Sequence, residues 1–179
     1  YAEARAVLQD ISVEHSRFYD NYPRAQLAKA RSFELEGNWD RAFTEYRFLI
    51  EHYAGTDEAL STYLYLERHF SQDRRPTEAE RWYSQGLETF SQMATRDGLP
   101  AARALMYQAD MYRQRSEWDQ AARTLAQLFE RFPDTNMGRQ AILTAAVVQR
   151  EKLRQPAVAD SLIDQYKRSL IDFGEDPSL

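Results

Sequence analysis

An internal repetition, in which two short motifs each recur once at almost the same separation, constrains the fold of this chain more than any other feature of its sequence. The segments EGNWDRA, residues 36–42, and RSEWDQA, residues 115–121, place Trp-Asp-x-Ala in the same frame. The segments RRPTEA, residues 74–79, and RQPAVA, residues 154–159, share a Pro-x-x-Ala pattern. Self-similarity at a fixed period is typical of folds that are built from stacked units.

The two motifs alternate along the chain and divide it into four units of similar length. Each motif ends on an alanine, and these alanines, which follow one another at similar intervals, are Ala42, Ala79, Ala121 and Ala159. Between them apolar residues recur at intervals of three and four, as in Leu27, Ala30 and Phe33, which is the period of a helix. We therefore expect four helical pairs that stack, because no pair can bury its apolar face alone.

Turn-forming residues place the helix boundaries. Gly37 separates the two helices of the first pair, and residues 132–135, Phe-Pro-Asp-Thr, end one helix and start another. Thr77 and Glu80 have the spacing of a capping box, in which the two side chains satisfy backbone N–H groups at a helix start. Residues 95–100 are expected to form a longer loop, which accounts for the wider spacing between the second and third of the repeated alanines.

The domain organisation follows from these boundaries. We expect residues 1–22 to form an N-terminal helix that belongs to a partial preceding repeat. Residues 23–172 should form the four helical pairs, and residues 173–179 a flexible tail. The chain opens at Tyr1 rather than at a methionine, so we expect it to be a fragment of a longer protein.

Composition argues against several classes of function. The net charge of −5 is unfavourable for a nucleic-acid-binding protein, which needs Lys and Arg to neutralise phosphates. The absence of cysteine excludes thiol catalysis and thiolate metal sites. No stretch approaches the roughly 18 apolar residues that span a bilayer, so we expect no transmembrane segment.

The pattern resembles the tetratricopeptide repeat (TPR) over about residues 23–172. The first pair has the small, aromatic and glycine residues of that family in the expected order: Ala30, Phe33, Gly37, Trp39, Ala42 and Tyr46. The third pair supplies Ala109, Tyr112, Trp118, Ala121 and Pro133. The resemblance implies an all-α fold, a TPR-like α-solenoid of antiparallel helical hairpins forming a right-handed superhelix, and a function in protein–protein interaction.

The sequence departs from the family pattern at several positions. Ser116 replaces the glycine of the third pair, and Pro76 and Pro156 replace the aromatic residue between the helices of the second and fourth pairs. Glu67 stands where the family places a small packing residue. Residues 130–141 are similar to bacterial periplasmic TPR proteins of outer-membrane assembly, which implies a periplasmic or outer-membrane-associated protein, with a cytoplasmic one as the alternative.

The resemblance also implies a binding surface, because the first helix of each TPR pair lines a concave groove that receives partner segments. Transferred residue by residue, this face comprises Arg24, Leu27, Arg31, Leu64, Arg68, Arg103, Met106 and Arg113, with Glu34, Ser61, Ser71, Asp110, Thr144, Val148 and Glu151 beside them. Its five arginines would receive acidic side chains or a terminal carboxylate of a partner through bidentate hydrogen bonds. The alternative is that these arginines only keep an exposed helix face soluble.

No other constellation predicts chemistry. The three histidines lack the spacing that would place two of them on one helix face as metal ligands, and no phosphate loop or nucleophile motif occurs. The aromatic residues at helical spacing are more typical of packing than of sugar stacking. We therefore expect no catalytic residue, cofactor or metal site.

Three functions remain open at this point. A scaffold that binds a protein or peptide in an assembly is the leading hypothesis. A regulatory or substrate-positioning arm of a larger enzyme is the alternative, and a helical-repeat nucleic-acid binder is the third, which the net charge disfavours. A homo-oligomer is also conceivable, because the ends of a solenoid expose apolar faces.

Overall fold

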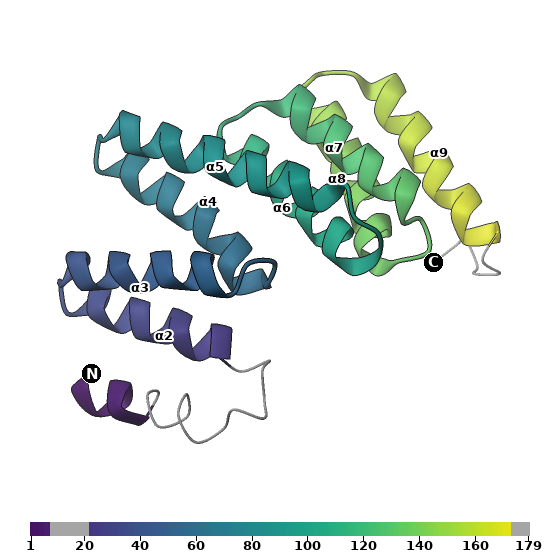
Figure 1. The fold of residues 1–179 in the computed structure, drawn as a ribbon. Coiled ribbons are helices and arrows are strands. Elements are labelled where there is room, and N and C mark those ends of the chain that lie inside the picture. Colours follow the sequence, from purple (N-terminus) through teal and green to yellow (C-terminus); the bar gives the residue numbers. More distant parts are fainter. Residues whose placement is uncertain (8–21, 173–179) are drawn as a thin grey trace. The chain divides into compact units, whose positions relative to one another are not determined.

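The computed structural model describes residues 1–7 and 22–172, and every regular element in these residues is an α-helix (Figure 1). The helices are α2 (Tyr22–Leu35), α3 (Trp39–His52), α4 (Asp57–Gln72), α5 (Pro76–Ala94), α6 (Gly98–Gln114), α7 (Trp118–Arg131), α8 (Asn136–Glu151) and α9 (Pro156–Asp172). Residues 2–7 are also helical. The predicted all-α architecture of helical hairpins is confirmed, whereas the right-handed sense of the superhelix stays a prediction.

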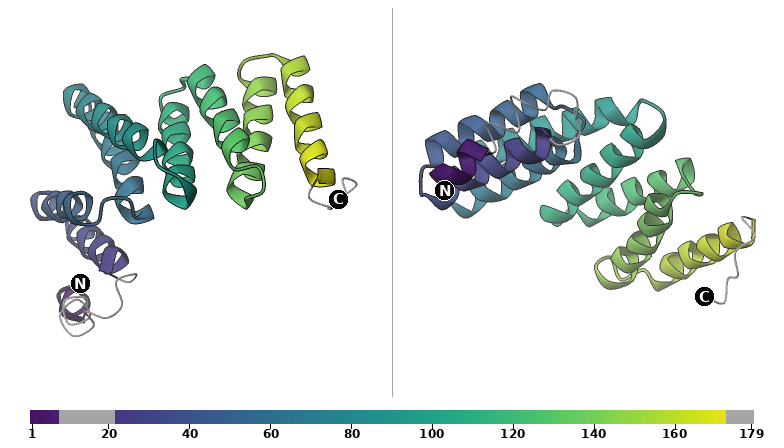
Figure 2. Two further views of the ribbon diagram at one scale, coloured as in Figure 1. Left: turned by 45° about the vertical axis from the view of Figure 1, so that its right-hand side comes forward. Right: turned by 90° about the horizontal axis from the view of Figure 1, so that it is seen from below.

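The chain divides into two compact units, residues 1–66 and residues 67–179. In the first unit α2 packs on α3, and the buried side chains include Ala30, Tyr46, Leu49 and Leu60. In the second unit α6, α7, α8 and α9 lie side by side in chain order (Figure 2), and the buried side chains include Leu105, Met111, Leu125, Leu128 and Ile142. Each unit therefore has a core of its own.

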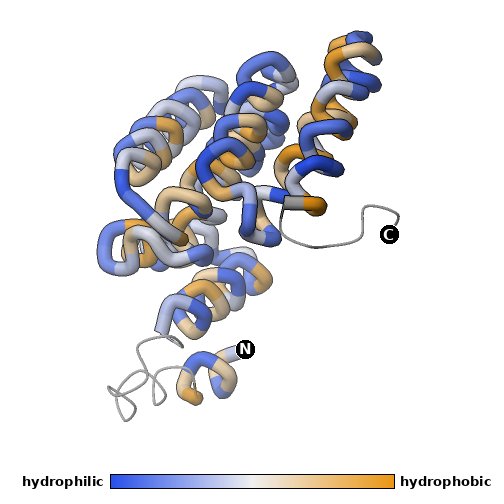
Figure 3. The backbone as a smooth tube through the Cα atoms, turned by 90° about the vertical axis from the view of Figure 1, so that its right-hand side faces the viewer, coloured by the Kyte–Doolittle hydropathy of each residue, from blue (hydrophilic) through white to orange (hydrophobic). Residues whose placement is uncertain are grey.

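Hydrophilic and hydrophobic residues follow one another at short intervals along the helices (Figure 3). This is the pattern of a helix that buries one face and exposes the other. No helix among the described residues is long and apolar enough to cross a membrane.

The four repeated alanines lie in the first turn of α3, α5, α7 and α9. Each is at most 2% exposed, and its backbone N–H donates a hydrogen bond to the carbonyl four residues earlier, as from Ala121 to Glu117 at 3.0 Å. A small side chain lets the neighbouring helix approach closely at this point, and a larger one would cost about 1–3 kcal/mol. The repeated alanines are therefore packing positions.

The turn before each alanine contains one residue with a left-handed backbone. These residues, each five positions before its alanine, are Gly37, Arg74, Ser116 and Arg154, with φ angles between 58° and 74°. In the first three turns the following N–H donates to a carbonyl five residues back, as from Glu117 to Tyr112 at 2.8 Å. This bond closes the helix in the Schellman manner and requires the left-handed residue.

We expect Ser116→Gly to raise the free energy of unfolding by about 0.5–1 kcal/mol, because a left-handed conformation costs an L-residue about 1–2 kcal/mol and glycine loses part of that gain to chain entropy. Urea unfolding measures the change. Gly37→Ala is the matched control and should destabilise by a similar amount through the backbone alone, since a Cβ there would meet no atom within 4 Å. Destabilisation by Ser116→Gly would contradict this explanation of the turn.

Two local predictions are wrong. Thr77 and Glu80 do not form a capping box, because α5 begins at Pro76 and its N-cap, Arg75, makes no side-chain capping bond. Proline is suited to a helix start because it lacks the N–H that would otherwise need a partner. The loop predicted over residues 95–100 is also too long, since α6 already begins at Gly98.

The predictions for the two ends of the chain remain untested. Most of the helix predicted over residues 1–22, and the flexible tail predicted over residues 173–179, lie outside the described residues. Tyr22 and Pro23 lie at the start of α2, where the sequence analysis placed the end of the preceding helix.

Candidate functional site

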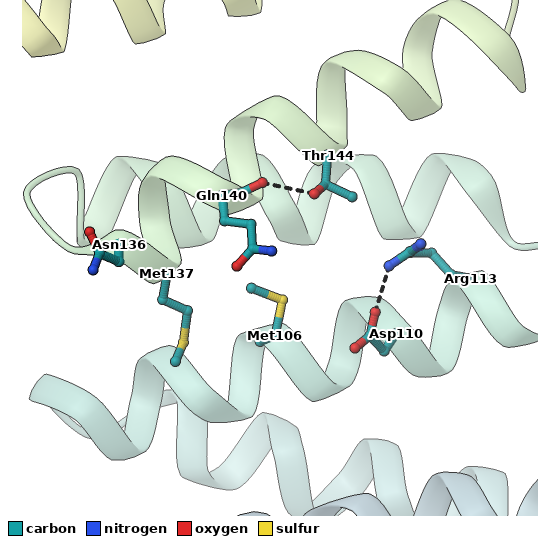
Figure 4. Close-up of a pocket in the computed structure, with 7 residues that line it drawn as sticks. All are labelled: Met106, Asp110, Arg113, Asn136, Met137, Gln140 and Thr144. Atoms are coloured by element: carbon teal, nitrogen blue, oxygen red, sulfur yellow. Dashed lines mark hydrogen bonds and ion pairs between the residues drawn. The ribbon is translucent and has the colours of Figure 1, made fainter. Parts of the chain in front are cut away.

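A pocket of about 480 Å³ lies between α6 and α8 of the second unit (Figure 4). Its lining comes from the first helices of the third and fourth pairs and consists of Met106, Asp110, Arg113, Asn136, Met137, Gln140 and Thr144. Met106 extends from α6 toward α8, and Met137 and Gln140 extend from α8 toward α6. Ligand pockets in proteins typically have volumes of roughly 300–1,000 Å³, so this one could hold a side chain and part of its backbone.

The start of α8 is fixed by local hydrogen bonds, and this positions the α8 wall of the pocket. The hydroxyl oxygen of Thr135 accepts from the N–H of Gly138 at 3.0 Å, which caps the helix. The guanidinium of Arg139 donates to Oδ1 of Asn136 at 2.7 Å. Met137, between these groups, is therefore held on a defined first turn.

The charges in the lining of the pocket are paired with one another. Nη1 of Arg113 lies 2.8 Å from Oδ1 of Asp110, three residues earlier on α6 (Figure 4). Burial raises the pKa of the Asp110 carboxyl, and the Arg113 guanidinium partly offsets that increase. The remaining lining residues carry no charge, so the lining as a whole is neutral.

The uncharged polar groups are available to different degrees. The Thr144 hydroxyl donates to the backbone carbonyl of Gln140 at 2.8 Å (Figure 4), which leaves its oxygen as an acceptor. The Gln140 side chain is exposed and carries both a donor and an acceptor. The pocket thus combines two half-buried thioethers with an amide that can bind a peptide backbone. Among residues 1–7 and 22–172, no cluster of His, Cys, Asp or Glu could hold a metal ion.

The first unit has a second pocket, of about 410 Å³, between the N-terminal segment, α2 and α4. Its lining residues are Tyr1, Arg24, Leu27, Ala28, Arg31, Ser32, Leu35 and Glu58. Arg24 and Glu58 are 3.2 Å apart, so Glu58 partly neutralises the two arginines. The N-terminal segment is held on α2 by Arg5, which pairs with Glu36 at 2.7 Å and lies over the ring of Phe33.

Glu34, on the predicted binding face of α2, has a structural role instead. It accepts a hydrogen bond of 2.7 Å from the hydroxyl of Tyr46 on α3 and another from the hydroxyl of Tyr65 on α4. Burial, and then the hydrogen bond to Glu34, raise the pKa of both tyrosine hydroxyls. These bonds join three helices of the first unit.

The structure gathers the predicted site residues into two groups and leaves three aside. Arg24, Leu27 and Arg31 line the pocket of the first unit, and Met106 and Arg113 line the pocket of the second. Leu64, Arg68 and Arg103 line neither of these pockets.

Part of the α8 wall was not predicted from the sequence, and one residue predicted on this face of α8 is buried. Val148 is buried, at 4% exposure, because it faces the helices that pack on α8. Met137 and Gln140 were overlooked, although they lie seven and four residues before Thr144 and therefore on the same face of the helix. Extending the face of Thr144 toward the start of α8 would have found both.

Comparisons with known proteins agree with this fold. Residues 103–135, which span α7 and most of α6, match the family model described as tetratricopeptide repeat. No curated protein matches the chain. The crystal structure of BtubC (BKLC) from P. vanneervenii is similar, with a TM-score of 0.57 and 17% identity, and the match covers 97% of this chain and 72% of that one.

At 17% identity the likeness to BtubC shows the fold alone. The match to the family model concerns sequence, and it falls on the pair that supplies Ala109, Tyr112, Trp118 and Ala121. The periplasmic type within the family stays a prediction. The α6–α7 pair therefore contains a tetratricopeptide repeat, within a chain whose other described helices form hairpins of the same kind.

Proposed function

We propose that this chain is a non-catalytic scaffold that binds a peptide segment of a partner protein in the pocket between α6 and α8. The observation that carries the proposal is the pocket itself, which lies between the first helices of two successive pairs and exposes Met106 and Met137 to solvent in part. Apolar side chains gain free energy when a partner covers them, and the exposed amide of Gln140 can bind the backbone of that partner.

Acidic groups of a partner are better suited to the first unit than to the second. The lining of the α2–α4 pocket holds two arginines and one carboxylate, which gives a net positive charge beside Leu27 and Leu35. The lining of the α6–α8 pocket is neutral, because Asp110 pairs with Arg113. We propose that a partner's acidic residues bind at Arg24 and Arg31 and its apolar residues at the α6–α8 pocket.

Met137→Lys is expected to weaken binding of peptides selected on the full chain from a random library by about tenfold or more, because a bound apolar side chain would bury the lysine ammonium. Fluorescence anisotropy of the labelled peptides measures the loss. Leu143→Lys is the matched control, since Leu143 lies on the same helix, is 40% exposed and does not line the pocket. Equal affinities of the wild type and Met137→Lys would refute binding at this site.

We further propose that the scaffold acts in a multiprotein assembly of a bacterial cell envelope, which is supported by the similarity of residues 130–141 to periplasmic TPR proteins. Fractionation of cells that express the full-length protein tests this location. The alternative is an arm that positions a substrate for a larger enzyme, and it requires a catalytic domain in the full-length open reading frame.

We also propose that the chain self-associates through α9, because Val158 and Ile171 on this helix are 41% and 60% exposed. Sedimentation velocity over a range of protein concentrations distinguishes a monomer from an oligomer.

A further inference from the structure

From the chemistry of the α6–α8 pocket we infer that its ligand is an uncharged peptide segment with an aromatic anchor side chain. The inference rests on the proposed function and adds the class of partner to it. It is carried by three observations: the two thioethers, the paired charges and the size of the pocket.

The thioethers favour an aromatic side chain over an aliphatic one. Met106 and Met137 extend into the pocket from opposite walls, and both are half-buried. Sulfur is polarisable and interacts favourably with the edge of an aromatic ring, whereas an aliphatic side chain gains only from burial. A ring between the two walls can contact both sulfur atoms.

The paired charges remove a reason for the pocket to select a charged ligand. The Arg113 guanidinium is already bonded to Asp110 at 2.8 Å, and Arg139 donates to Asn136, a lining residue, at 2.7 Å. An acidic ligand would have to compete with Asp110 and Asn136 for the two guanidinium groups. A basic ligand would have to compete with Arg113 for the Asp110 carboxylate. Partly exposed charge pairs also contribute little to affinity at physiological salt.

The size and the polar groups of the pocket suit a side chain together with its own backbone. A volume of about 480 Å³ exceeds the space that one aromatic ring fills, so the backbone amides on either side can enter as well. The Gln140 amide and the Thr144 hydroxyl oxygen are available to bond them. Flexible methionines also adapt to rings of different size, so phenylalanine, tyrosine and tryptophan should all be accepted.

Four synthetic peptides test the inference, with Phe, Leu, Ala or Glu at the central position of one uncharged background. The full chain is labelled with ¹³C at the methionine methyl groups, of which there are four. Met106 and Met137 report on the pocket, while Met93 and Met111, at 7% and 0% exposure, are internal controls. Met106→Leu and Met137→Leu assign the signals, since each removes one of them.

We expect the Phe peptide to shift the Met106 and Met137 signals, to leave those of Met93 and Met111 in place, and to bind about three- to tenfold more tightly than the Leu peptide. Tighter binding of the Leu or the Glu peptide, with the same two signals shifting, would overturn the aromatic anchor and leave the proposed binding site intact. If these peptides and peptides selected from a random library all fail to shift the two signals, the proposed function fails as well.

Two variants separate the contributions of sulfur and charge. The double variant Met106→Leu/Met137→Leu keeps the apolar volume and removes both sulfur atoms. It should therefore bind the Phe peptide and the Leu peptide with about equal affinity. Asp110→Asn leaves Arg113 without its carboxylate, so the Glu peptide should gain at least about threefold in affinity. A preference for Phe that persists in the double variant would overturn the role of the thioethers.

Discussion

Gly138→Ala is expected to destabilise the second unit by about 2–3 kcal/mol and to lower its melting temperature by roughly 5–10 °C. The reason is steric, because a Cβ at this position would lie 1.9 Å from the backbone oxygen and 2.8 Å from the carbonyl carbon of Phe132. Backbone atoms cannot move aside as the end of a flexible side chain does. The same Phe132 oxygen also accepts hydrogen bonds from the N–H and the hydroxyl of Thr135, which hold it in place.

The sign of this effect is what makes the experiment informative. Gly138 lies inside α8, and alanine is favoured over glycine in a helix interior by about 1 kcal/mol, so helix propensity alone predicts stabilisation. Val147→Ala introduces the same residue at a position of the same helix that is 53% exposed, and it should destabilise by less than about 0.5 kcal/mol. Calorimetry that finds Gly138→Ala as stable as the wild type would show that the close approach to Phe132 is absent.

Arg115→Met is expected to cost about 3–5 kcal/mol, because it leaves the buried carboxylate of Glu67 without its cation. The Glu67 side chain is 2% exposed, and its Oε1 lies 2.5 Å from Nε of Arg115. Another nitrogen of the same guanidinium, Nη1, lies 3.3 Å from Oε2 of Glu80. Ser71 and Gln114 donate hydrogen bonds to the same Glu67 carboxylate. These two neutral donors cannot replace the charge of the guanidinium.

The double variant Glu67→Gln/Arg115→Met tests whether the loss comes from the unpaired charge. A glutamine carries no charge, and it can accept from Gln114 through its oxygen while its amide nitrogen donates to the Ser71 hydroxyl. The double variant should therefore recover at least about 1 kcal/mol relative to Arg115→Met. Urea unfolding of the wild type, the two single variants and the double variant gives the coupling energy. Additive losses would show that the pair contributes only through packing, for instance of Arg115 on the ring of Tyr83.

Glu67 also shows why one departure from the family pattern did not change the fold. The sequence places it where a small residue is expected, and the structure confirms that this position is buried. The partner that makes the carboxylate tolerable is Arg115, far along the chain at the end of α6. No local pattern in the sequence connects the two residues.

The face of α6 that lines the pocket was predictable in direction and only in part by residue. Helical spacing brought Met106 and Arg113 onto one face of α6, where the structure has them. Spacing could not show that Asp110 neutralises Arg113, because that depends on the side-chain conformations. Since the two charges cancel, Arg113 gives this pocket no net positive charge.

The sequence by itself determined the helices and their pairing, because each depends on residues that are close along the chain. The regular recurrence of Ala42, Ala79, Ala121 and Ala159 indicated the register of the four pairs, and Gly37 marked the turn of the first pair. Local periodicity and turn chemistry are sufficient for such elements.

Only the tertiary structure decided which side chains from different helices meet. Three features depend on distances of a few ångströms between backbone segments, and these distances are set by packing. They are the pocket between Met106 and Met137, the Glu67–Arg115 pair and the close approach of Gly138 to Phe132. Because packed interiors respond to the volume of a single methyl group, these contacts cannot be read from the spacing of residue types along one helix.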